Sequence, residues 1–276
     1  MNIQQINKDV ERLERECWST IIQQYFNALS SNQVKTKANA HDFQTIADVQ
    51  SEAFLTAELQ KLIPDSIVLG EEAQAAGTVS LDIFKQAKQD QHVWVIDPID
   101  GTFNFVHAKD DFALMVSLVK NNETLGAWIF KPRSDDFIYA NKGQGAFMNG
   151  QQTQVSKREA LADLTGYSPI LYSNQTPYKA HFQTAAQDVD GLDNLQCAGV
   201  HYMNMATGSA DFYLANHSKP WDHLAGALIL EEAGGVVTQW DGSPYKPMDN
   251  SVYLIAANSP KSHKALMDRF IHPVWR

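Results

Sequence analysis

The sequence WVIDPIDGTFNF, residues 94–105, determines how the rest of the chain is interpreted. Residues 94–96 predict a short buried strand, and Pro98 is expected to stop it between two aspartates, Asp97 and Asp100. The two residues after Asp100 then open a predicted helix. Carboxylates at a strand end supply the oxygen ligands that Mg²⁺ prefers, and a helix N-terminus attracts a phosphate. The dipeptides alone favour an ordinary turn, so the choice depends on the remainder of the chain.

Composition and charge limit the classes of protein to which the chain can belong. With 276 residues and 44% hydrophobic content, it can bury a large core as one domain or two intimate halves. A net charge of −10 argues against a nucleic-acid-binding surface, which would carry a basic stripe, so no direct nucleic-acid binding is expected. Cys17 and Cys197 predict free thiols in a reduced compartment. With no signal peptide, and no apolar stretch long enough to cross a membrane, we expect a cytoplasmic protein.

Residues 1–150 predict two helices and a largely antiparallel sheet. Apolar residues at helical spacing indicate an amphipathic helix over 3–29, and a second helix is expected from Thr45 to Ile63. Its end is marked by Pro64. The other predicted elements of this half are a strand at 66–70, a possible helix near 79–88, the strand at 94–96, and strands at 112–120, 124–132 and 135–142.

Residues 151–276 alternate between strand and helix, which is typical of an α/β fold. The polar stretch 150–163 is the best boundary between the two halves. The fold class is therefore α/β, with α+β character in the first half. The predicted elements of the second half are strands near 192–197, 210–215, 236–239 and 252–258, and helices at 202–206, 221–233 and 260–271.

Five acidic residues recur at one kind of position, a strand end or a helix start: Asp48, Glu71, Asp97, Asp100 and Asp222. Each has an ordinary explanation by itself: Asp222 in the first turn of a helix complements the helix dipole, Glu71 could be a solvated loop charge, and Asp48 a surface residue within a helix. Together, four carboxylates and a carbonyl would hold two Mg²⁺ ions about 4 Å apart and clamp both the attacking and leaving oxygens of a phosphoryl group.

Several motifs resemble the signatures of the inositol monophosphatase superfamily, and they occur in family order over nearly the whole chain. The resemblance implies a layered α/β/α/β/α sugar-phosphatase-like fold and a single catalytic unit over 1–276, in which residues 1–150 contain the metal site and 151–276 supply Asp222. The motifs are TIAD (45–48), LGEE (69–72), DPIDGTFNF (97–105), NKGQGAFMNGQ (141–151), ATGSAD (206–211) and PWDHLAG…EEAGG (220–235).

The resemblance also implies two or three Mg²⁺ ions per active site and assigns ligands to them. The second ion would be held by Asp97, Asp100 and Asp222, with Asp97 bridging to the first, and Glu71 would reach a third, weaker site through water. The first ion would be surrounded by Glu71, Asp97, the backbone carbonyl of Ile99, and Thr102.

Catalytic roles follow from the same resemblance. Thr102, hydrogen-bonded to Asp48, would help to activate the attacking water, with Glu71 as a further catalytic residue. The backbone N–H groups of Gly101 and Thr102 would bind the phosphate. A metal-activated water needs no covalent phosphoenzyme. The resemblance further implies inhibition by lithium and a homodimer.

The chain departs from the family pattern in its substrate pocket. Where family members that act on inositol phosphate place a glutamate, seven residues before the metal-binding aspartate, this chain has Ala215, which puts inositol specificity in doubt. Lys219 either faces the pocket and meets a second anionic group or is a solvated loop lysine. Further candidates for the pocket rim are Arg133, His107 and His201.

The leading prediction is an Mg²⁺-dependent phosphatase of a small phosphorylated metabolite, an inositol or sugar monophosphate. The alternatives within this class are a 3′(2′),5′-bisphosphate nucleotidase, a fructose-1,6-bisphosphatase and a histidinol-phosphatase. An alternative of another class is a regulatory protein that binds a macromolecular partner, because some bacterial relatives of the family are thought to act on transcription complexes.

Overall fold

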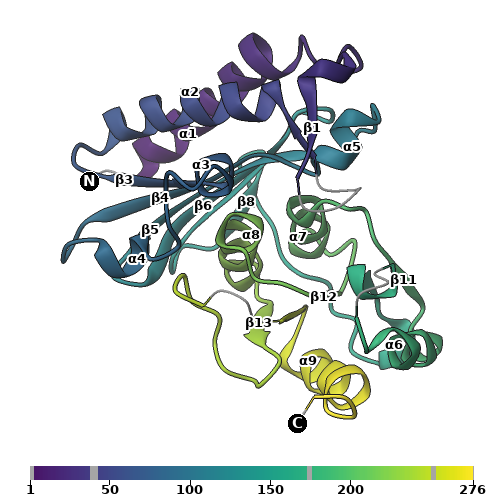
Figure 1. Ribbon diagram of the computed structural model, residues 1–276. Coiled ribbons are helices and arrows are strands. Elements are labelled where there is room, and N and C mark those ends of the chain that lie inside the picture. The colour runs from purple at the N-terminus through teal and green to yellow at the C-terminus, as the bar shows by residue number, and fades with distance from the viewer. Residues whose placement is uncertain (1–2, 38–42, 173–175, 250–252, 276) are drawn as a thin grey trace.

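The computed structural model describes residues 3–37, 43–172, 176–249 and 253–275. Within these ranges, no helix combines the length and the apolar character needed to span a membrane. Helices and two large sheets alternate in layers through the molecule, and the chain passes from the first sheet to the second at about its midpoint (Figure 1).

Helices α1 and α2 cover one face of a seven-stranded sheet, and α7 and α8 pack against its other face (Figure 1). The opposite sides of α7 and α8 contact a five-stranded sheet, whose far face is covered by α6 and α9. This confirms the predicted α/β/α/β/α layering. The helices are α1 (Ile3–Cys17), α2 (Ile46–Leu62), α6 (Lys179–Ala185), α7 (Ala198–Ala206), α8 (Pro220–Glu232) and α9 (Pro260–Leu266).

The seven-stranded sheet has the order β3-β4-β5-β6-β7-β8-β9. β3 runs parallel to β4, and the other neighbouring pairs are antiparallel. Its strands are β3 (Ile67–Gly70), β4 (His92–Asp100), β5 (Ala113–Lys120), β6 (Glu123–Lys131), β7 (Asp136–Asn141), β8 (Ala146–Met148) and β9 (Gln151–Gln152). Short elements beside it are β1 (Val34–Thr36), β2 (Phe43–Thr45), α3 (Glu71–Ala75), α4 (Ile83–Gln86) and α5 (Thr102–Val106).

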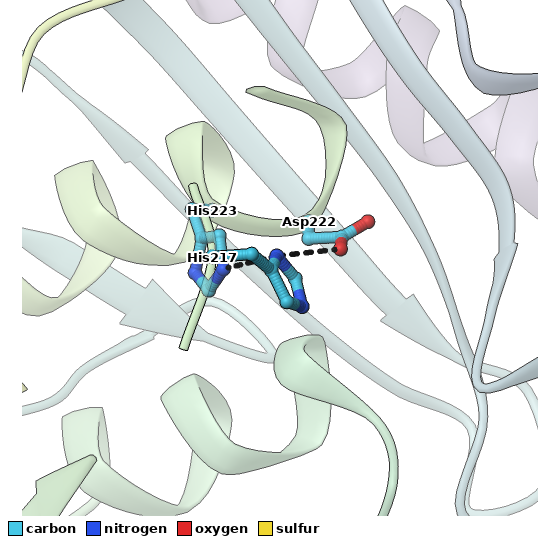
Figure 2. A group of neighbouring side chains, drawn as sticks. All are labelled: His217, Asp222 and His223. Carbon is cyan, nitrogen blue, oxygen red and sulfur yellow. Dashed lines mark hydrogen bonds and ion pairs between the residues drawn. The ribbon is translucent and has the colours of Figure 1, made fainter. Parts of the chain in front are cut away.

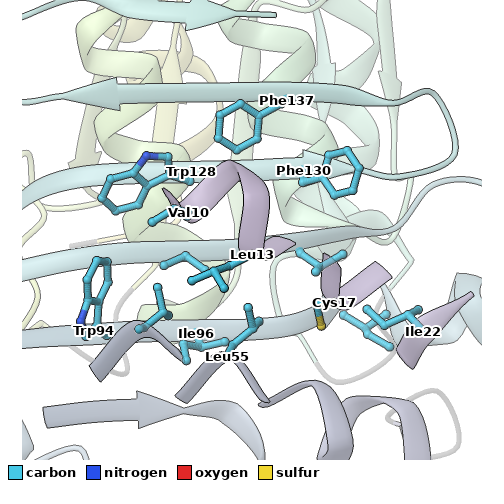
Figure 3. Close-up of a cluster of buried hydrophobic side chains, with 14 of the residues drawn as sticks. Val10, Leu13, Cys17, Ile22, Leu55, Trp94, Ile96, Trp128, Phe130 and Phe137 are labelled. Atoms are coloured by element: carbon cyan, nitrogen blue, oxygen red, sulfur yellow. The ribbon is translucent and has the colours of Figure 1, made fainter. Parts of the chain in front are cut away.

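Alternating side chains assign each face of this sheet to one helical layer. On β5, Val116 lies in the core with α1 and α2, whereas its neighbour Met115 lies in the core with α7 and α8. Figure 3 shows the first of these cores, where Leu13 of α1 and Leu55 of α2 lie among the side chains of the central strands, with Trp128 beside them. Both faces are apolar, so the strands read as continuous hydrophobic runs.

The five-stranded sheet has the order β11-β10-β12-β14-β13 and is mixed. β10 is parallel to β11 and β12, but β14 runs antiparallel to both of its neighbours, β12 and β13, so the β/α alternation in the sequence does not produce an all-parallel sheet. β10 and α6 are absent from the sequence predictions. The strands are β10 (Thr165–Tyr167), β11 (Gly191–Asp193), β12 (Phe212–Ala215), β13 (Val236–Gln239) and β14 (Leu254–Ala257).

The predicted helix over 3–29 is too long. α1 ends at Cys17 and is followed by a π-helical turn over Trp18–Ile22. The hydroxyl of Thr20 donates to the carbonyl of Glu16 at 2.7 Å, and such back-bonding competes with the regular helix ladder.

Three boundaries in the second half also shift. The strand predicted at 192–197 is β11, which ends at Asp193, and the helix predicted from Tyr202 is α7, which begins at Ala198. The first residue of the strand predicted at 252–258 lies outside the described residues, and β14 covers Leu254–Ala257.

In the first half, the helix predicted near 79–88 is reduced to the single turn of α4.

Candidate active site

The strand that carries Asp97 and Asp100 continues through Pro98, so the expectation that this proline stops it is wrong. Asp97 pairs with Met115 and Asp100 with Ala113, and the register shift between these two pairs is a β-bulge. A bulge leaves one residue out of the ladder, which is where a proline without an N–H is tolerated. Met115 and Ala113 both face α7 and α8, so the bulge turns both aspartates onto that face as well.

Three carboxylates converge on this face from three separate elements. Asp97 of β4, Glu71 at the start of α3 and Asp222 in the first turn of α8 place oxygen atoms within 4.8 Å of one another. Asp97 is 2% exposed, and the side chains of Glu71 and Asp222 are 15% and 16% exposed. Because β3 and β4 are parallel neighbours, Glu71 leaves the sheet at the same edge as Asp97.

Burial and mutual repulsion oppose negative charge in this cluster. Burial raises the pKa of Asp97 well above its usual range, and the charges of Glu71 and Asp100 raise it further. Burial also raises the pKa of Glu71, while the ammonium of Lys37 opposes that shift. Lys37 Nζ lies 2.9 Å from Glu71 Oε1 and 2.9 Å from Glu72 Oε1. A set of buried carboxylates with this electrostatic cost fits a divalent cation, whose charge offsets theirs.

Asp100 lies next to the cluster and also begins a helix. Its Oδ2 accepts hydrogen bonds from the N–H of Gly199 at 2.5 Å and from Cys197 Sγ at 3.0 Å, at the start of α7. Burial raises the pKa of Asp100 to about 7, and the charge of Asp222 contributes to the rise. Asp100 therefore caps α7 through one oxygen and has Oδ1 to offer to a cation.

The predicted pair of Asp48 and Thr102 is in contact. Thr102 Oγ1 lies 3.3 Å from Asp48 Oδ1 and 2.9 Å from the carbonyl oxygen of Ile99. Thr45 fixes Asp48, because its N–H and hydroxyl donate to Asp48 Oδ2 at 2.7 and 2.5 Å in the capping box that begins α2. Burial raises the pKa of Asp48 to about 7.

The carboxylate cluster, Asp100 and Thr102 line a cavity of about 800 Å³, whereas Asp48 lies behind Thr102 and is not a lining residue. Gly101 at its wall adopts a φ of 85°, and a Cβ on it would lie 2.9 Å from the carbonyl oxygen of Asp111, so this position requires glycine. The predicted site residues that line the cavity are Glu71, Asp97, Ile99, Asp100, Gly101, Thr102, His201, Lys219 and Asp222.

The predicted substrate-pocket residues separate into two groups. Lys219 lines the cavity, and its ammonium lies 5.8 Å from the centroid of the Trp221 ring. His201 also lines it, but burial lowers the pKa of His201 to about 3, and its Nε2 accepts a hydrogen bond from the N–H of Leu195. Ala215 is fully buried in the core between β12 and α8 and is not a lining residue, so its expected place in the pocket is wrong.

Two rim candidates lie away from the cavity lining. Arg133 pairs with Asp110 at 2.7 Å and lies over the ring of Phe26. His107 stacks on Phe103, a lining residue, with ring centroids 4.2 Å apart. His107 therefore reaches the cavity through two lining residues, Phe103 and Phe43, whose ring centroid lies 6.0 Å from that of His107.

The sequence predictions do not include Lys37, His217 or His223. Lys37 stands in no recognisable pattern, and only the tertiary fold brings it to Glu71. His217 and His223 flank Asp222 within HSKPWDH, residues 217–223, and histidines close in sequence to an acid are a detectable metal-ligand pattern.

Comparison with known proteins places this geometry in context. The profile of the inositol monophosphatase family matches residues 6–276. The chain is 29% identical to inositol-1-monophosphatase of Bacillus subtilis, over 98% of each protein. It is 29% identical to fructose-1,6-bisphosphatase/inositol-1-monophosphatase of Thermotoga maritima over 76% of each protein, and 30% identical to Nus factor SuhB of Xylella fastidiosa over 88% of this chain and 86% of that protein.

Solved structures share the fold. The crystal structure of an IMPase/NADP phosphatase complexed with Mg²⁺ and phosphate superposes with a TM-score of 0.83, at 21% identity, over 97% of this chain and 95% of the other.

Proposed function

The chain belongs to the inositol monophosphatase family of phosphomonoesterases, and we propose that it hydrolyses a small phosphomonoester, an inositol or sugar monophosphate, with Mg²⁺ in the cavity beside Asp97. One observation carries the proposal: Glu71, Asp97 and Asp222, which are far apart in sequence, place buried oxygens within 4.8 Å of one another. A cluster of this kind repels a phosphate unless cations neutralise it.

The residues present fit Mg²⁺, because all the offered ligands are hard oxygens. Glu71, Asp97 and Asp222 would hold two or three ions, and Asp97 would be shared between them. The carbonyl of Ile99, Thr102 Oγ1 and Asp100 Oδ1 would complete the ligand set. When bound, Mg²⁺ supplies positive charge to the phosphate oxygens and makes a coordinated water more acidic.

Thr102 and its neighbours position the other reactants. The hydroxyl of Thr102 can donate to the Ile99 carbonyl at 2.9 Å or to Asp48 Oδ1 at 3.3 Å; with that carbonyl holding the cation, it would donate to Asp48, and Thr102 Oγ1 would accept a hydrogen bond from the attacking water. Gly101 and Thr102 both line the cavity, and their N–H groups would bind the phosphate there. No side chain needs to be phosphorylated in this scheme.

The cavity supports a broad or altered specificity rather than a strict preference for inositol 1-phosphate. Position 215 brings no carboxylate acceptor into the cavity, because Ala215 is buried and does not line it, and a lost hydrogen bond to a charged acceptor costs roughly 1.5–3 kcal/mol. Lys219 brings a positive charge to the cavity, which suits a second anionic group, as in fructose 1,6-bisphosphate or 3′-phosphoadenosine 5′-phosphate. The relative from Thermotoga maritima is named for both a bisphosphatase and a monophosphatase activity.

Phosphate release from a panel of phosphorylated metabolites tests this proposal. We expect no activity after exhaustive chelation and full recovery on addition of Mg²⁺; hydrolysis undiminished by chelation would refute the metal requirement. On Lys219→Ala, kcat/KM for bisphosphates should fall about tenfold more than kcat/KM for inositol 1-phosphate. Lys264→Ala on α9 is the matched control, because Lys264 is 77% exposed and pairs with Asp268. Equal losses for both substrate classes would exclude a specificity role for Lys219.

A regulatory role is a second candidate, because one relative carries the name of a Nus factor. The two roles separate in Asp97→Asn, which should abolish hydrolysis while leaving a binding surface elsewhere intact. A homodimer in the cytoplasm also remains a proposal that rests on the family and on composition. Light scattering at micromolar concentration that returned the 30.8 kDa mass of one chain would contradict the dimer.

A further inference from the structure

A second cluster of potential metal ligands shares Asp222 with the carboxylate site. His217 Nδ1 lies 3.4 Å from Asp222 Oδ2, and His223 Nε2 lies 3.4 Å from His217 Nδ1. All three ligand atoms lie within 4.8 Å of one another. Figure 2 shows His217 between the other two side chains, at the start of α8.

We propose that His217, Asp222 and His223 form a binding site for a borderline divalent transition metal such as Zn²⁺, next to the carboxylate site for Mg²⁺. This site goes beyond the proposed phosphatase activity, and its ligand set is chemically different. Two imidazole nitrogens and one carboxylate oxygen suit Zn²⁺, Co²⁺ or Ni²⁺, whereas Mg²⁺ prefers oxygen ligands alone.

The ligand spacing fits this class of ion. Ligands bound tetrahedrally at about 2.0–2.1 Å, the Zn–N distance, lie about 3.3–3.4 Å apart. The two measured edges, from His217 to Asp222 and from His217 to His223, are each 3.4 Å. Small side-chain rotations would therefore suffice to close the set around one ion.

Hydrogen bonds hold the cluster only loosely. His217 Nδ1 faces both Asp222 Oδ2 and His223 Nε2 at 3.4 Å, and in a neutral imidazole it is either a donor or an acceptor. As a donor it shares one N–H between the carboxylate and the lone pair of His223 Nε2, and both contacts are long for hydrogen bonds; as an acceptor from His223, its lone pair meets the lone pairs of the carboxylate. A cation at the centre would bind all three atoms at once.

Tyr202 provides the outer partner that a metal-binding histidine usually has. Its hydroxyl lies 3.1 Å from His223 Nδ1, and both side chains are fully buried. An Nδ1–H that donates to this hydroxyl leaves Nε2 as the lone-pair nitrogen and directs it toward His217. His217 is 40% exposed and lines the cavity, so an ion has a route of entry and positions open to water.

Zinc titration of the full-length protein by calorimetry, in excess Mg²⁺ and without substrate, tests the proposal. We expect one Zn²⁺ per chain for the parent protein. His217→Gln should weaken this binding at least about tenfold, and Tyr202→Phe should weaken it about 10–100-fold, as losses of outer partners typically do. His272→Gln is the matched control, because His272 is exposed, also pairs with an aspartate, and lies beyond α9.

Cobalt spectroscopy provides an independent readout. Co²⁺ in this site should give the intense visible absorption of a four-coordinate ion with nitrogen ligands, and His217→Gln should remove it. Zinc binding that is unchanged in His217→Gln, or equally reduced in His272→Gln, would overturn the proposal. Since the measurements use metal alone, such a result would leave the proposed hydrolysis unaffected, and a failure of hydrolysis would leave the zinc result unaffected.

Discussion

Asp97→Asn should have opposite effects on stability and on catalysis. In the metal-free protein, the ionised carboxylate of Asp97 repels Glu71 and Asp222, whose ligand oxygens lie within 4.8 Å, and this repulsion together with burial raises the pKa of Asp97. Two unit charges at that distance repel by about 3.5 kcal/mol at an effective dielectric constant of about 20. The asparagine keeps the shape, can still accept from the N–H of Ile99, and donates its amide protons to the neighbouring carboxylates.

We therefore expect Asp97→Asn to raise the free energy of unfolding of the metal-free protein by about 2–3 kcal/mol at pH 8. For a chain of 276 residues, that corresponds to a rise in melting temperature of roughly 3–5 °C. Differential scanning calorimetry in chelator measures the effect. In Mg²⁺ the order should reverse, because the parent gains stability from the ion and the variant gains much less.

Catalysis should be nearly lost in the same variant. If Asp97 bridges the ions, its loss forfeits several kcal/mol of charge stabilisation in the transition state, or at least about a hundredfold in turnover. Turnover within a few-fold of the parent would show that Asp97 is not the shared ligand.

Asp211→Asn is the matched control for Asp97→Asn, because Asp211 is also a buried aspartate but pairs with an arginine instead of facing other carboxylates. Asp211 is fully buried and accepts hydrogen bonds from Arg158 Nε at 2.8 and 3.0 Å and from the N–H of Thr165 at 2.8 Å. Its neutralisation should destabilise the protein by about 1.5–3 kcal/mol. If Asp97→Asn also destabilised the metal-free protein at pH 8, repulsion within the carboxylate cluster would be refuted.

Three further predictions follow from the site. Burial raises the pKa of Asp48 and that of Asp100 to about 7, so between about pH 4 and 7 the folded protein binds more protons than the unfolded chain. The free energy of unfolding in chelator should therefore fall as the pH rises through that range. A melting temperature that rises instead would contradict this. Lithium should inhibit, by resemblance to the family, through the site of Asp100 and Asp222; a dose series to high millimolar Li⁺ at constant ionic strength checks this. Gly101→Ala should cost more than about 1 kcal/mol in chemical denaturation, since the position has a φ of 85° and a Cβ would meet a carbonyl oxygen at 2.9 Å.

The sequence predicted those helices and strands whose ends are marked by local signals, such as a capping residue, a proline or a turn. Thr45 and Asp48, the first and last residues of TIAD, form the capping box that begins α2, and Pro220 is the first residue of α8. These signals place Asp48 and Asp222 in the first turns of their helices. The layered fold followed from the family motifs and their order, and continuous apolar runs separated by short turns located β5, β6 and β7.

Elements stabilised by distant partners were not predictable in this way. β10 has only three residues, one of them Gly166, and exists because it pairs with β11 and β12 on its two sides. The early start of α7 has the same origin. Its cap is the carboxylate of Asp100, which lies far away in sequence, while the side chain of Cys197 at the N-cap accepts no hydrogen bond from the N–H groups of the helix.

The bulge in β4 explains why the residues of the candidate site could be predicted from the sequence, whereas their arrangement in space could not. Two residues three apart on a regular strand point to opposite faces, so Asp97 and Asp100 could meet only if the chain turned after Pro98 or if the strand carried an extra residue. The register with β5 selects the second solution and aims both aspartates at α7 and α8. Asp222 and the start of α7 lie on that side, in the middle helical layer, which the second half of the chain supplies. The carboxylate cluster therefore depends on packing between the two halves, and its ligand geometry is a property of the tertiary fold rather than of the motif.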